Sequence, residues 1–315
     1  MLNIVLVLSL EKQKEVEAYY STSKIDRNAP GVIFAAKLPD TAITVYKSGK
    51  VMFQGIGAER EASKFGKVNT TASPQSNSPV KTKGDKLPED FHTMSVIGSD
   101  ETGTGDYFGP ITVAAVYVPK DKIELIRELG VKDSKMLTDP IMLKMAKDIM
   151  LVCPYSILTL NNIKYNEIQG KGYSQGKIKA MLHNQALKQV LKKIEPEKPD
   201  YILIDQFAER DTYYKHIQNE KEIIRENVLF STKAEQLHVA VAAASILARY
   251  AFLKEMDRLS SGVGITLQKG ASNKVDEMAA KIWIKYGEEQ LKSISKWHFA
   301  NTEKAKKIIN LKHKK

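Results

Sequence analysis

The segment Gly98–Pro110 places two adjacent acids and a glycine-rich turn between two apolar runs. Asp100 and Glu101 end the first run, and β-branched residues resume at Ile111. The pattern predicts a strand, a tight turn and a second strand. Because successive strand side chains point to opposite faces, the two acids share a metal ion only if the backbone turns between them. Glycines permit such a bend and the close approach of a ligand backbone, which favours chemistry on a phosphodiester.

Two other interpretations of this segment stay open. Residues 103–109 read G-x-G-x-x-x-G, one residue off the dinucleotide-binding pattern. A helix should follow that pattern, whereas Pro110 and a β-branched run follow here, and the two acids would repel a pyrophosphate. The acids can also be solvated side chains beside a structural turn.

Two further acids stand where strands and helices meet. Asp205 ends the apolar run 201–204, which is typical of a strand in a covered sheet. Glu235 lies in the first turn of a helix expected at 234–259, which is rich in alanine and therefore packs closely on a sheet. Each acid alone is also explained as a cap or a first-turn acid favoured by the helix dipole.

Taken together, these positions predict four carboxylates at one edge of a sheet: Asp100, Glu101, Asp205 and Glu235. Such a cluster repels itself unless cations neutralise it. Oxygen-only ligands favour Mg²⁺ or Mn²⁺ over zinc. Two such divalent cations can activate a water molecule and stabilise the leaving oxygen of a phosphoryl transfer.

The charge of the chain favours a polyanionic partner. The formal net charge is +11, and residues 281–315 contain ten lysines against three glutamates, a local excess of seven. A single cysteine excludes an internal disulfide. The apolar run 2–10 is too short to span a bilayer and lacks the flanks of a signal peptide, so we expect a cytoplasmic protein without a membrane partner.

Composition divides the chain into three parts. Residues 1–66 predict a small α+β domain in the order β-α-β-β-β-α, and the Ser-, Pro- and Lys-containing stretch 67–90 predicts a flexible linker. Residues 91–315 predict an α/β domain with its site at strand ends.

Five segments in order resemble bacterial ribonuclease HIII, a type 2 ribonuclease H related to ribonuclease HII. They are Asp100–Pro110, Lys132–Lys135, His183–Leu187, Asp205–Phe207 and Ala234–Gln236. The resemblance implies an RNase H-like α/β fold with a mixed sheet flanked by helices, preceded by a domain like the TATA-box-binding protein. It also implies a two-metal endoribonuclease, expected to be a monomer, that cuts the RNA strand of RNA–DNA hybrid duplexes and leaves 5′-phosphate and 3′-hydroxyl ends. The four carboxylates become the metal ligands and catalytic residues.

Two differences separate the chain from ribonuclease HII. Its turn reads Gly103-Thr104-Gly105 where ribonuclease HII typically has Gly-Arg-Gly, and its fourth acid is Glu235 where ribonuclease HII usually has aspartate. A ribonuclease HII-like enzyme acting on single embedded ribonucleotides and a non-catalytic hybrid-binding protein remain the alternatives.

Selecting RNA requires contact with the 2′-hydroxyl, for which the backbone of the glycine turn is the candidate. Polar residues nearby are candidates for phosphate or sugar contacts, although each can also be an ordinary surface residue. The predicted substrate-binding residues are Gly103, Thr104, Gly105, Lys132, Ser134, Lys135, Asn184, Gln185 and Lys233, with Tyr46, Lys47 and Lys50 in the small domain.

Overall fold

The computed structural model describes residues 3–27, 31–66, 84–131 and 138–312. The chain divides into two compact units. The first comprises Met1–Lys81 with Arg127–Gly130, and the second comprises Thr82–Ile126 with Val131–Lys315.

The first unit is an antiparallel sheet with helices on one face. Its elements are β1 (Asn3–Val7), α1 (Leu10–Tyr19), β2 (Val32–Lys37), β3 (Thr41–Tyr46), β4 (Lys50–Gly55) and α2 (Ala58–Ala62), with strand order β1-β4-β3-β2. Alternate side chains such as Ile43, Val45 and Phe53 join the apolar core under the helices. The order predicted from the sequence is confirmed.

The second unit is built on a mixed five-stranded sheet. Its strands are β5 (Val96–Thr102), β6 (Ile111–Val118), β7 (Tyr155–Leu160), β8 (Tyr201–Asp205) and β9 (Val228–Ser231), in the order β7-β6-β5-β8-β9. Strands β5, β6 and β7 pair antiparallel, whereas β8 lies parallel to both β5 and β9. Every residue of β6 is buried, which explains its uninterrupted apolar sequence.

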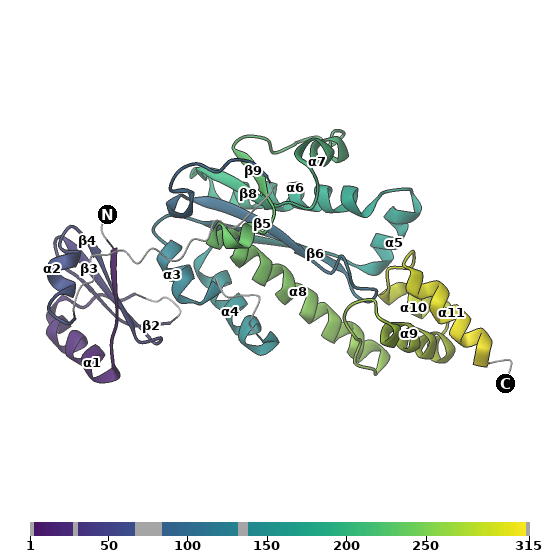
Figure 1. Cartoon of the computed structure of the whole chain (residues 1–315), viewed down its shortest axis with the longest axis horizontal. Coiled ribbons are helices and arrows are strands. Elements are labelled where there is room, and N and C mark those ends of the chain that lie inside the picture. Colours follow the sequence, from purple (N-terminus) through teal and green to yellow (C-terminus); the bar gives the residue numbers. More distant parts are fainter. Residues whose placement is uncertain (1–2, 28–30, 67–83, 132–137, 313–315) are drawn as a thin grey trace. The chain divides into compact units, whose positions relative to one another are not determined.

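Two long helices cover opposite faces of this sheet, as Figure 1 shows. Helix α6 (Gln175–Ile194) packs on one face with Ile97, Val113 and Ile204. Helix α8 (Val239–Val263) packs on the other, where its backbone at Ala240 approaches Gly98 of β5 closely. The alanines at the start of α8 permit this approach, as the sequence pattern predicts.

The remaining helices surround this core. They are α3 (Ile123–Glu128), α4 (Asp139–Val152), α5 (Asn162–Gly170), α7 (Arg210–His216), α9 (Asn273–Tyr286), α10 (Glu288–Ile294) and α11 (Ala300–Lys312). Helices α9–α11 share an apolar cluster with Tyr107 and Phe108, which follow the glycine turn. In the described ranges, no helix is both long and apolar enough to cross a membrane.

The structure differs from the sequence-based expectations in three short elements and in the bounds of the linker and of α8. Strand β9 and helices α5 and α10, of four, nine and seven residues, are not predicted. The predicted linker 67–90 extends too far. Gly84 pairs with Ser231 and the Asp85 N–H donates to the Phe230 carbonyl at 2.8 Å, so this end lies against β9. Residues 67–83 lie outside the described ranges.

We expect Gly98→Ala to destabilise the second unit by about 1–3 kcal/mol. The added Cβ would overlap the backbone of Ala240 and Val241, which cannot move without shifting α8 off the sheet. Urea unfolding followed by tryptophan fluorescence measures the loss, since Trp283 and Trp297 both lie in this unit.

The matched control is Gly262→Ala in α8, where an added Cβ meets no described atom within 4 Å. This variant should keep its stability or gain up to about 1 kcal/mol from helix propensity. Equal stability of the two variants would contradict the close packing of β5 on α8.

Candidate active site

Asp100 and Glu101 lie side by side in β5 and point to opposite faces of the sheet. They pair with Ala114 and Val113 of β6, and the strand continues through Thr102. The expectation that the backbone turns between the two acids is therefore wrong, because regular antiparallel pairing holds both of them. The turn comes directly after the strand, where Gly103 takes a φ of 96°.

Asp100 is a buried acid on the α8 face. Its side chain is 9% exposed and hydrogen-bonds with Ser245 of α8, and its Oδ1 accepts the Glu101 N–H at 2.7 Å. Burial, followed by the charges of Asp205 and Glu101, raises the pKa of Asp100 to about 8. Asp100 is thus a carboxyl group that stays protonated below about pH 8 unless positive charge is brought beside it.

Asp205 ends β8, one strand away from β5. Its Oδ1 accepts the Ala234 N–H at 2.9 Å. Burial raises its pKa, the Ala234 hydrogen bond opposes this, and the charges of Glu235 and Glu101 add to the increase. The structure therefore brings Asp100 and Asp205 within electrostatic reach of each other, as the placement at neighbouring strand ends predicts.

Glu235 lies between β9 and α8. It belongs to a 3₁₀ turn, Ala234–Gln236, that follows Lys233 with a φ of 56°. The prediction that Glu235 occupies the first turn of the long helix is wrong, because α8 begins only at Val239 after an N-cap at His238. The irregular turn presents Glu235 next to Asp205, and one of its carboxylate oxygens is buried.

Glu101 is held on the α6 face by two side chains of that helix. Lys179 Nζ lies 2.8 Å from its Oε1 and His183 Nε2 lies 2.9 Å from its Oε2. The His183 Nδ1 contacts Ser99 Oγ at 2.7 Å, and Phe207 stacks on the imidazole with ring centroids 5.1 Å apart. Burial acts to raise the pKa of Glu101, but the hydrogen bonds and charges of His183 and Lys179 outweigh it and lower the pKa.

Lys179 and His183 were not identified from the sequence as contacts of the acidic cluster. Their only sequence signal is a spacing of four residues, which puts two side chains on one face of a helix. In residues 3–27, 31–66, 84–131 and 138–312, no three His, Cys, Asp or Glu side chains are arranged so that they could hold a metal ion together.

In the glycine turn after β5, Gly103 is closely packed, whereas Gly105 has free space around it. Gly103 packs against the Pro110 carbonyl, so a side chain there would overlap the backbone. At Gly105, an added Cβ would meet no atom of the described chain within 4 Å. The turn therefore places a bare backbone position, Gly105, shortly after Asp100 and Glu101.

The other predicted substrate contacts have different outcomes. Asn184 is buried, donates to the Glu222 carbonyl at 2.8 Å and accepts the Ile224 N–H at 3.0 Å. Its predicted phosphate or sugar contact is wrong, because both ends of the amide hold an internal loop. Gln185 and Lys233 are exposed. Lys132, Ser134 and Lys135 lie outside the described residues.

In the first unit, the three predicted residues surround the β3–β4 turn. Tyr46 is only 2% exposed at the end of β3, so it does not present its ring for stacking as predicted. Lys47 is exposed in the turn and Lys50 begins β4.

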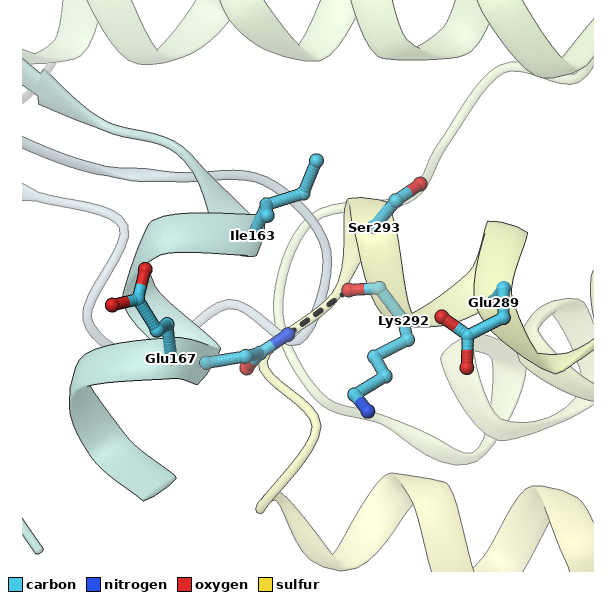
Figure 2. Close-up of a pocket in the computed structure, with 6 residues that line it drawn as sticks. Ile163, Glu167, Glu289, Lys292 and Ser293 are labelled. Carbon is cyan, nitrogen blue, oxygen red and sulfur yellow. Dashed lines mark hydrogen bonds between the residues drawn. The ribbon is translucent and has the colours of Figure 1, made fainter. Parts of the chain in front are cut away.

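A pocket of about 380 Å³ lies between α5 and α10. It is lined by Ile163, Asn166, Glu167, Glu289, Lys292 and Ser293 (Figure 2). None of these is a predicted site residue. Asn166 has a structural role in this pocket, since its side-chain amide donates to the Lys292 carbonyl at 2.9 Å.

We expect Asp100→Asn to stabilise the protein in EDTA by about 0.5–2 kcal/mol at pH 8. The folded-state pKa of Asp100 is raised from 3.8 to about 8, so the folded state binds more protons than the unfolded state between these values. Wild-type stability should fall as pH rises through this window, and asparagine removes that loss. Urea unfolding at pH 4.5 and pH 8 measures the difference, which should shrink at the lower pH.

Asp257→Asn is the control, because Asp257 is an exposed acid of α8. It should change stability little at either pH. A gain for Asp100→Asn that is the same at both pH values would show that charge repulsion is not its cause.

Comparison with known proteins identifies the family. Residues 97–302 match the family model for ribonuclease HII, and residues 3–78 match a domain of unknown function (DUF3378). The chain is 66% identical over 309 residues to ribonuclease HIII of Lysinibacillus sphaericus, covering 98% of this chain and all of the relative. It is 52% identical over 305 residues to ribonuclease HIII of Bacillus pumilus, covering 97% and 99%.

A solved structure agrees with these relatives. The crystal structure of Bst-RNase HIII in complex with Mn²⁺ matches with a TM-score of 0.69 and 44% identity, over 98% of this chain and all of that chain. The second unit thus has the RNase H-like fold that the motifs imply. The chain belongs to the ribonuclease HIII family.

Proposed function

We propose that this protein, a ribonuclease H-type endonuclease by family, hydrolyses the RNA strand of RNA–DNA hybrids and leaves 5′-phosphate and 3′-hydroxyl ends. The observation that carries the proposal is the pair Asp100 and Asp205. Both carboxyl groups have raised pKa values at the edge of the sheet, beside a glycine turn with an open backbone. Buried acids with raised pKa values cluster at functional sites, and these two would bind cations beside a phosphate backbone.

The donor set fits hard divalent cations. Asp100, Glu101, Asp205 and Glu235 offer only carboxylate oxygens, which Mg²⁺ and Mn²⁺ prefer. Mn²⁺ is bound by the related Bst-RNase HIII. A pair of such cations would activate a water molecule and stabilise the leaving oxygen. Glu101 points to the opposite face from Asp100, so it joins this set only by leaving Lys179 and His183 and turning toward the edge of the sheet.

The remaining roles fall to groups around the acids. Gly103, Thr104 and Gly105 place their backbone against the RNA 2′-hydroxyl. Lys233 is exposed two residues before Glu235, where its ammonium group binds a phosphate. Gln185 contacts the backbone from the exposed side of α6, and Lys132, Ser134 and Lys135 bind phosphates.

The first unit adds affinity rather than chemistry. Lys47 and Lys50 flank the β3–β4 turn and bind the hybrid backbone electrostatically. We assign the protein to the bacterial cytoplasm, where hybrids form. It acts as a monomer, because one chain supplies every proposed site residue.

The central prediction is that the protein cleaves an RNA–DNA hybrid in Mg²⁺ or Mn²⁺ and spares RNA–RNA and DNA–DNA duplexes. Asp205→Asn should reduce hybrid cleavage by about 10³-fold or more, because it removes a ligand charge, while hybrid binding is kept. End-labelled duplexes measure cleavage, and a gel shift in EDTA measures binding.

The same assay separates the alternatives. Efficient cutting at a single ribonucleotide embedded in duplex DNA would favour a ribonuclease HII-like activity. Binding without cleavage in either metal would identify a non-catalytic hybrid-binding protein. Lys292→Met serves as the control variant, since Lys292 lines the pocket in Figure 2 rather than the acidic cluster.

Deleting residues 1–66 should weaken hybrid binding while the second unit keeps its metal-dependent cleavage. Each lost phosphate contact reduces the slope of log K against log salt concentration by about 0.9. Hybrid affinity measured across a salt series gives this slope. An unchanged affinity and slope would remove the first unit from substrate binding.

A further inference from the structure

The carbonyl groups of the glycine turn are held by two side chains from distant parts of the chain. Gln175, at the start of α6, donates its amide to the Thr104 carbonyl at 3.0 Å. Lys296, between α10 and α11, donates its ammonium group to the carbonyls of Asp106, Gly109 and Pro110 at 2.8, 2.6 and 3.3 Å. Neither residue belongs to the acidic cluster or to the predicted substrate contacts.

Lys296 is fully buried. Burial lowers its pKa to about 7, and the charge of Asp106 opposes this change. An ammonium group has three N–H donors, and three backbone carbonyls accept from it here. Burying an ammonium group costs free energy unless its N–H donors are paired. The three carbonyls pair the donors of Lys296, and the lysine in turn holds these carbonyls of the turn together.

The chain around Lys296 reinforces the same contact. Its own backbone N–H donates to the Tyr107 carbonyl at 2.8 Å, and the Gly109 N–H donates to the Ile294 carbonyl at 3.0 Å. The buried ring of Tyr165 lies between the two side chains. Its hydroxyl is 3.3 Å from Gln175 Nε2, and its ring centroid is 6.0 Å from Lys296 Nζ.

The geometry of the peptide group links these contacts to substrate recognition. In a trans peptide, the C=O and the following N–H point in opposite directions. Because Gln175 binds the Thr104 carbonyl, the Gly105 N–H points away from Gln175. Beyond its two chain neighbours, no described atom lies within 4 Å of a Cβ added at Gly105, so there is space for a ligand beside this residue.

We propose that Gln175 and Lys296 are positioning residues that lock the glycine turn with the Gly105 N–H directed at the 2′-hydroxyl of the RNA strand. The inference rests on the proposed function, because it needs an RNA strand beside this turn. Gln175 sets the direction of the N–H, and Lys296 fixes the end of the turn. Recognition of RNA thus depends on two side chains that do not touch the substrate.

The test is a double-mutant cycle in which one change is a substitution in the protein and the other is the removal of one 2′-hydroxyl from the substrate. One hybrid carries a short run of ribonucleotides, and its partner replaces the ribonucleotide before the scissile phosphate with its 2′-deoxy form. We expect wild-type kcat/KM to fall about 10- to 100-fold on this replacement, the range of one hydrogen bond to the substrate. In Gln175→Ala and Lys296→Met the same replacement should cost less than about threefold.

The outcomes separate positioning from general stability. A variant that is slower on both hybrids but retains the wild-type penalty for the deoxy substitution would overturn the inference. Lys292→Met, the same substitution on neighbouring α10, should keep the full penalty. If Lys296→Met does not fold, as judged by circular dichroism, Gln175→Ala decides the question alone, since Gln175 is only half-buried.

Failure of the proposed function looks different. A wild-type protein that cleaves no hybrid would reject that function. A wild-type protein that cleaves both hybrids equally would reject this inference alone, because the turn would not read the 2′-hydroxyl.

Discussion

Repulsion among carboxylates at one buried edge of the sheet is the constraint on which the rest of the site depends. Asp100 and Asp205 are largely removed from water, and burial followed by the charge of Asp205 raises the pKa of Asp100 to about 8. A fold keeps such a destabilising arrangement where positive charge arrives with a ligand. The β-sheet supplies the rigidity, since β5 and β8 are neighbours and hold their acids at fixed positions.

The two adjacent acids have different charged surroundings on the two faces of the sheet. On the α8 face, small residues pack closely against Gly98. Asp100 hydrogen-bonds with Ser245 on this face, and few charges there offset the cost of its ionisation. On the α6 face, Lys179 and His183 neutralise Glu101. The metal-binding role that we propose for Glu101 therefore requires competition between a cation and two side chains of the protein. Asp100 has no such cationic contact among the interactions that set its pKa.

The C-terminal helices have a role that their lysine content does not reveal. The basic residues of 281–315 predict a surface for a polyanion, yet Lys296 is buried among the carbonyls of the glycine turn. The segment that follows α10 pairs with the turn through Phe108 and Ser295. In our proposal this segment supports substrate recognition from within the protein, whereas exposed lysines such as Lys47 and Lys233 act on the phosphate backbone.

Local pattern predicted the first sheet, four strands of the second and the long helices, and the resemblance of short motifs predicted the family, because periodicity and motifs are properties of neighbouring residues. It did not predict α5, β9 or α10. It also misplaced Asn184 and Tyr46, and it missed Lys179, His183, Gln175 and Lys296 as partners of the site. The four missed side chains contact residues 71 to 190 positions away, such as Thr104 and Asp106. Only tertiary packing decides whether a polar side chain turns toward solvent, a loop carbonyl or a carboxylate, because the choice depends on what the rest of the fold brings beside it.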